Sequence, residues 1–166
     1  LERLGRRGIR VDDLCRRFRE LTEDVAFYMA PSPERVGAQR LVWRGSIPEA
    51  RTALSGLMDM ADERGEPSSY ALQRLHVCEL ELRAGGWAAA SRVLDEWAES
   101  ADFEYMRGLV YERCRALAAA GWGDAPEARR WAGEAIAAAE ANGLGWQRLE
   151  ALRARGLASL LEPDLA

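Results

Sequence analysis

Residues 72–100 have the sequence LQRLHVCELELRAGGWAAASRVLDEWAES. The stretch is rich in Ala, Leu and Glu, which favour helix, and it is interrupted once, at Gly85-Gly86-Trp87. Glycines that directly follow a helical pattern indicate a helix end and a tight turn. We therefore predict one helix before the turn and a second helix that returns antiparallel to the first.

The whole chain has the composition of an all-α protein. Of its 166 residues, 48% are hydrophobic, most of them Ala and Leu, and β-branched residues are too few to favour strands. This length is enough for one domain with a core. All 23 basic residues are Arg, so a lysine Schiff base and a P-loop lysine are excluded within this sequence.

The cysteines indicate neither a metal site nor a disulfide framework. Cys15, Cys78 and Cys114 are far apart and form no CxxC pair. We therefore expect no cofactor and a reducing, cytoplasmic compartment. No apolar run approaches the roughly 20 residues of a membrane span, so no membrane association is expected. The sequence begins without Met and stops within the helical pattern, which leads us to expect a segment of a larger protein.

Helical patterns of the same kind occupy the rest of the chain. Ser32 is expected to cap a helix whose first residue is Pro33. The helices expected outside the central stretch span residues 11–29, 33–43, 48–64, 102–120, 126–141 and 146–161.

Two sets of small residues recur with nearly the same period. One set lies seven places before each turn and consists of Ala38, Cys78, Cys114 and Ala154. The other lies early in each second helix and consists of Ala50, Ala90, Ala128 and Ala166. Both sets repeat at intervals of about 36–40 residues, and such a period indicates a structural repeat. Small residues facing each other let two helix backbones approach closely, so we interpret Cys78 and Cys114 as small core residues.

The repeat predicts a right-handed solenoid of antiparallel helix hairpins, because a single hairpin cannot bury its apolar face alone. Residues 1–31 are expected to form a partial repeat, mainly its second helix, and residues 32–166 three hairpins and a final helix. The exposed ends of such a solenoid would be covered by further repeats or by self-association, so a homo-oligomer is possible.

The motif of a small residue, then Gly seven places later and Ala five places after that, resembles the tetratricopeptide repeat. It is present in residues 38–50 and 78–90, and with a two-residue insertion in residues 114–128. The period is longer than the usual one of about 34 residues, and the usual Leu-Gly and Tyr of the first helix are missing.

The segments CELELRAGGWAAASRVLDEW (78–97) and GDAPEARRWAGEAIAAAEANGLGW (123–146) resemble the central region of the large ATP-dependent LuxR-type transcriptional regulators. This resemblance implies a non-catalytic segment that senses an effector or a partner protein. The ATPase of that family has no counterpart here, since no GxxxxGK[ST] motif occurs. No recognition helix of a helix-turn-helix is evident either. The alternative is a tetratricopeptide-like scaffold or adaptor that has no connection with transcription.

Catalytic chemistry is not indicated. His76 is the only histidine, and no motif pairs it with Ser, Cys or Asp. We interpret it as a core or groove-lining residue and expect no enzyme. Residues 1–19 contain seven Arg against three acidic residues, a balance of +4. They contain a single aromatic residue, Phe18, and no known docking motif of a nucleic-acid site, so no direct contact with nucleic acid is expected.

In repeats of this shape the first helices line a concave face that binds ligands. The residue directly after each small residue should lie on this face. By helical spacing, the residue three places before each small residue should lie there as well. The candidate groove residues are Arg35, Gln39, Leu75, Glu79, Tyr111, Arg115, Arg148 and Arg155. Because Arg pairs well with carboxylate and phosphate, the expected ligand is an acidic peptide or protein, or a small anionic effector. A merely solvated face remains an equal alternative.

Overall fold

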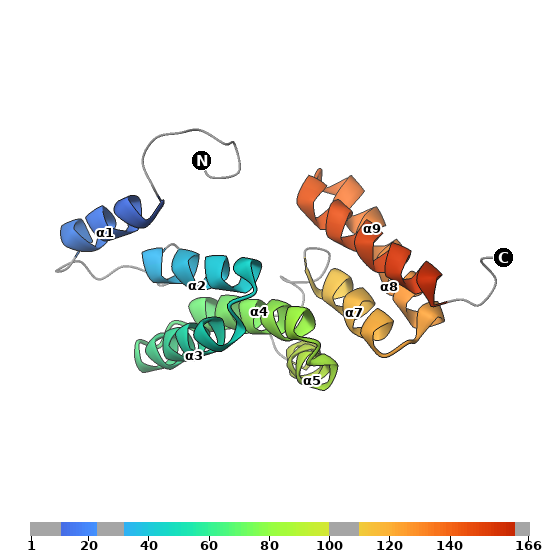
Figure 1. Ribbon diagram of the computed structural model, residues 1–166, viewed down its shortest axis with the longest axis horizontal. Coiled ribbons are helices and arrows are strands. Elements are labelled where there is room, and N and C mark those ends of the chain that lie inside the picture. The colour runs from blue at the N-terminus through green and yellow to red at the C-terminus, as the bar shows by residue number, and fades with distance from the viewer. Residues whose placement is uncertain (1–10, 23–31, 100–109, 162–166) are drawn as a thin grey trace. The chain divides into compact units, whose positions relative to one another are not determined.

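The computed structural model describes residues 11–22, 32–99 and 110–161, which form eight helices and no strand. The prediction of an all-α protein is therefore confirmed for this part of the chain (Figure 1). The described residues belong to two compact units, Leu1–His76 and Val77–Ala166. The predicted boundary between residues 31 and 32 adjoins residues outside the described part, and it stays a prediction.

The first unit contains α1 (Val11–Thr22), α2 (Pro33–Arg44), α3 (Ile47–Glu63) and the first part of α4 (Pro67–Ala84). The hydroxyl of Ser32 accepts a hydrogen bond from the backbone N–H of Arg35 at 3.1 Å. This confirms Ser32 as the cap of α2 and Pro33 as its first residue. The helix ends at Gly45, whose φ of 76° is a left-handed conformation that favours glycine.

Helices α2 and α3 pack against each other through small and branched apolar residues. The core positions on these two helices are Ala38, Val42, Ala50, Leu54, Leu57 and Ala61, all of them at most 3% exposed. Ala38 and Ala50 are two of the recurring small residues, and both are buried, as expected of core positions.

The second unit contains the remainder of α4, then α5 (Trp87–Ala98), α7 (Tyr111–Gly121), α8 (Ala125–Ala141) and α9 (Gly145–Leu160). Helix α8 packs against both α7 and α9, and α7 also contacts α5 and α9. The two helices predicted on either side of the Gly85-Gly86 turn are present as α4 and α5, although α4 begins earlier in the chain than residue 72, at Pro67. The turn after α4 contains Gly85, with a φ of 75°.

The core of the second unit combines small alanine and cysteine residues with the larger Leu80, Leu94 and Trp97. Cys78, Cys114, Ala90, Ala128 and Ala154 are 0% exposed, which confirms their interpretation as small packing residues. The Cys78 thiol lies 4.0 Å from the backbone carbonyl oxygen of Ala90 on the next helix. Ala166, the last residue of the predicted period, lies outside the described residues.

Candidate functional site

A hollow of about 340 Å³ lies on the second unit, between α4, α7 and α9 and the first turn of α5. Helices α4 and α7 are the predicted first helices of two successive hairpins, and α9 is the predicted final helix, which occupies the position of a further first helix. The lining residues are Glu79, Leu82, Arg83, Trp87, Arg113, Leu117, Ala120, Gly121, Glu150, Arg153, Leu157, Leu160 and Leu161. The volume falls in the range of small-molecule sites, and we call this feature the α4–α7–α9 hollow.

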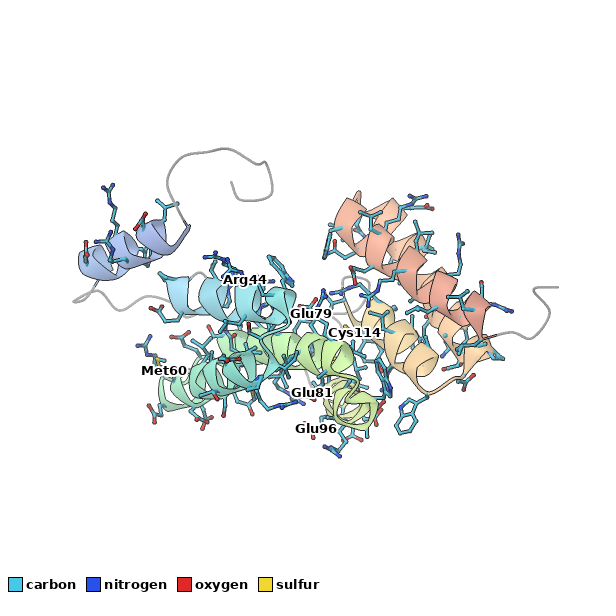
Figure 2. All side chains as sticks on the ribbon, viewed as in Figure 1. Arg44, Met60, Glu79, Glu81, Glu96 and Cys114 are labelled. Atoms are coloured by element: carbon cyan, nitrogen blue, oxygen red, sulfur yellow. The ribbon has the colours of Figure 1, made fainter. Side chains whose placement is uncertain are left out.

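A buried ion pair joins two of the lining helices. Arg113 on α7 donates from Nη2 to Oε1 of Glu79 on α4 at 2.7 Å, and the two side chains are only 6% and 12% exposed. Figure 2 labels Glu79 on α4 and Cys114, the neighbour of Arg113, on α7. The Nε of Arg113 is buried without a hydrogen-bond partner in the described part of the chain. The buried guanidinium therefore retains unused hydrogen-bonding capacity.

Further acidic charge keeps Arg113 ionised. Burial alone would lower the pKa of the Arg113 guanidinium, but the neighbouring Cys114, Glu79 and Glu150 raise it overall. Glu150 on α9 is itself paired with Arg153, which donates from Nη1 at 3.2 Å. The hollow thus contains two acid–base pairs, one buried at Arg113 and one more exposed at Arg153.

The apolar wall of the hollow depends on a close contact between Trp87 and Gly121. A Cβ at Gly121 would lie closer than 3.0 Å to three carbons of the Trp87 ring. The absence of a side chain at Gly121 therefore lets the indole lie directly against the end of α7. Leu82, Leu117 and Leu157 extend the apolar surface from this ring.

Replacing Gly121 by Ala is expected to lower the free energy of unfolding by about 1–3 kcal/mol, because the Trp87 ring must move away from the added methyl group. Thermal or urea unfolding measures the loss. Gly133 on α8 is the matched control, since a Cβ there meets no atom within 4 Å. Gly133→Ala should stabilise the protein by up to about 1 kcal/mol. Equal changes in stability for Gly121→Ala and Gly133→Ala would contradict the close contact between Gly121 and the Trp87 ring.

Three of the candidate residues predicted from sequence lie in the first unit. Arg35 is half-buried, with its Nη1 3.4 Å from Nε2 of His76, and burial lowers its pKa. Gln39 is half-buried and Leu75 is buried. His76 is 3% exposed, in agreement with its interpretation as a core residue. Close to it in sequence, Gln73 is fully buried and neither atom of its amide has a hydrogen-bond partner in the described region.

The other candidates lie in the second unit, and only Glu79 lines the α4–α7–α9 hollow. Arg115 instead donates to Asp95 at 2.5 Å and to the Tyr111 hydroxyl at 2.8 Å, and it lines a separate, smaller hollow with Trp122. Tyr111 is 4% exposed, its ring edge-to-face with that of Trp131.

Arg148 and Arg155, both exposed on α9, do not line the hollow either. Arg148 pairs with Glu140 at 2.8 Å. The predicted set is thus not gathered at one place within the second unit.

Sequence analysis missed the charged residues that do line the hollow with Glu79. Arg113 and Arg153 directly precede the small residues Cys114 and Ala154, whereas the prediction names the residues that follow them, Arg115 and Arg155. Arg83 and Glu150 were missed as well. One signal was available: Glu150 and Arg153 are three residues apart, a spacing that places both on one face of a helix.

The two cysteines of the core lie beside this site but not in it. A hydrogen bond between the Cys78 and Cys114 thiols, together with burial, raises the pKa of Cys78 well above its usual value. Within residues 11–22, 32–99 and 110–161, no group of three or more His, Cys, Asp or Glu side chains could hold a metal ion.

No helix in the described part of the chain has the length and apolar character needed to cross a membrane. Comparison of the chain with models of protein families, with curated proteins and with solved structures finds no match.

Proposed function

We propose that this chain is a non-catalytic sensing or protein-interaction segment made of tetratricopeptide-like hairpins, and that its α4–α7–α9 hollow binds an effector or a partner. The observation that carries the proposal is the hollow itself, with a buried Arg113 whose hydrogen-bonding capacity is only partly used. Three first helices line it, which is where a solenoid of such hairpins would have its concave face. A small anionic effector, or an acidic protein or peptide, is the proposed ligand.

The register of small residues supports the right-handed solenoid that belongs to this proposal. Two marker positions, one in each helix of a hairpin, are buried at Ala38 and Ala50, and again at Cys78 and Ala90. Together with the sequence resemblance, this favours the central region of a LuxR-type transcriptional regulator, in a cytoplasmic protein. The neighbouring coding sequence tests this origin: an ATPase upstream and a helix-turn-helix downstream are expected, and their absence would favour the scaffold alternative.

Binding at the hollow is tested by a thermal-shift panel of metabolites, nucleotides, sugars and acidic peptides. A ligand present at about 100 times its dissociation constant should stabilise the protein by about 2.7 kcal/mol, which is roughly 5–10 °C for a protein of this size. The shift should be lost in Leu157→Trp, which fills the hollow.

Leu149→Trp is the matched control for this panel. Leu149 lies on the same helix, is 59% exposed and does not line the hollow, so the thermal shift should persist in this variant. A shift that survives Leu157→Trp would exclude this hollow as the binding site. No shift with any compound would favour a scaffold that docks other proteins.

A further inference from the structure

The charges that line the α4–α7–α9 hollow do not cancel. Arg83, Arg113 and Arg153 carry three positive charges, and Glu79 and Glu150 carry two negative charges, which leaves a balance of +1. The whole chain, by contrast, has a net charge of −4. The hollow is therefore a locally cationic site on an acidic protein and matches a ligand with one negative charge.

Arg83 carries the positive charge that is left unbalanced. Glu79 accepts from Arg113 at 2.7 Å and Glu150 accepts from Arg153 at 3.2 Å, so both carboxylates have a basic partner. Arg83 is exposed and makes no hydrogen bond or ion pair within the described part of the chain. Its guanidinium remains available for a carboxylate, which it can bind through two parallel N–H groups.

The remaining lining residues are apolar. Leu82, Leu117 and Leu157, with the ring of Trp87, line the hollow beside the charged groups. Leu157 is 40% exposed, so a ligand that covers it would remove apolar surface from water. A sugar or a bare inorganic anion would leave this surface without a complementary group.

We propose that the ligand of this hollow is a small monocarboxylate with an apolar body, its carboxylate bound by Arg83 and Arg153 and its body packed against Trp87 and the leucines. This inference rests on the proposed function, since it specifies the ligand of the same site. A dianionic ligand fits less well because only one positive charge is unbalanced. The apolar wall also favours an effector of this kind over a strongly acidic peptide.

Isothermal titration calorimetry with three probes tests the proposal. 3-Phenylpropionate combines charge and apolar body, 3-phenylpropionamide has the same shape without charge, and acetate has the charge alone. We expect 3-phenylpropionate to bind, the amide to bind at least about tenfold more weakly through loss of a charge-assisted hydrogen bond, and acetate to give no measurable heat.

Two single substitutions locate the carboxylate. Arg83→Gln removes a cation that has no ion pair among the described residues, and it should weaken 3-phenylpropionate binding by about tenfold. Arg155→Gln removes the same charge from an exposed position on α9 that does not line the hollow, and it should leave the affinity unchanged. Equal affinity of acid and amide, or equal effects of the two substitutions, would overturn the proposal.

Failure of this inference can be told apart from failure of the proposed function. If 3-phenylpropionate gives no heat while a sugar, nucleotide or acidic peptide stabilises the wild type but not Leu157→Trp, the hollow is a binding site for a different ligand class. That result would overturn the monocarboxylate proposal and leave the proposed function in place. If binding of every ligand survives Leu157→Trp, both the monocarboxylate proposal and the proposed binding function of the hollow are overturned.

Discussion

Replacing Arg113 by Met is expected to lower the free energy of unfolding by about 3–5 kcal/mol. The side chains of Arg113 and Glu79 are 6% and 12% exposed, so the substitution leaves a nearly buried carboxylate without its partner. An unpaired buried charge costs far more than an exposed one. Urea unfolding followed by circular dichroism measures the loss.

The double variant Glu79→Met/Arg113→Met separates the cost of an unpaired charge from a general packing defect. Replacing both partners of a buried ion pair by apolar residues is often neutral or stabilising. The double variant is therefore expected to regain most of the stability lost in Arg113→Met. Arg155→Met, at an exposed position, should change stability by less than about 0.5 kcal/mol. A double variant no more stable than Arg113→Met would contradict this account of the pair.

Trp97→Ala is expected to lower the free energy of unfolding by about 3–5 kcal/mol. Trp97 on α5 is 1% exposed and is the largest fully buried side chain in the described part of the chain. Its removal would leave a cavity that the surrounding side chains can only partly refill. The same unfolding measurement applies.

Trp122→Ala is the matched control for this substitution. Trp122 follows α7 and is 60% exposed, although its Nε1 donates to the Ser91 hydroxyl at 3.3 Å. Its replacement should cost less than about 1 kcal/mol, since little apolar area is lost from the interior. A loss for Trp97→Ala as small as the one expected for Trp122→Ala would contradict the role of Trp97 in the core.

The helices and their small contact residues could be predicted from the sequence because both depend on local chemistry. Ser32 and Pro33 mark the start of α2 through a side-chain cap and a fixed φ. Gly45 and Gly85 mark turns through their positive φ angles. Cys78 and Cys114 could be predicted as core residues because they recur at a position that requires a small side chain. Only a small side chain suits a close contact between helices.

The charged residues of the site could not be placed in the same way. Adjacent residues on a helix are about 100° apart, so the residues before and after Cys114 face different directions. The structure turns Arg113 toward Glu79 and Arg115 toward Asp95. The direction of each Arg side chain depends on an acidic partner 34 or 20 residues away in the chain. Repeat spacing alone carries no information about these partners.

The gathering of charge at the hollow also depends on long-range packing. Glu79, Arg113 and Glu150 come from three different helices, which belong to two predicted hairpins and the predicted final helix. Sequence spacing identified Glu79 as a groove residue, but it could not show that α4, α7 and α9 enclose a hollow. The apolar wall at Trp87 likewise depends on its contact with Gly121, which belongs to the next predicted hairpin.

The most direct test of the proposed site is a titration followed at the tryptophan indole N–H groups by ¹⁵N nuclear magnetic resonance, with whichever compound of the panel raises the melting temperature most. Trp87 lines the α4–α7–α9 hollow, whereas Trp122 lines the smaller hollow beside Arg115. We predict that the Trp87 signal shifts progressively and saturates while the Trp122 signal stays in place. A saturating shift at Trp122 with an unmoved Trp87 signal would contradict the account and place the ligand elsewhere.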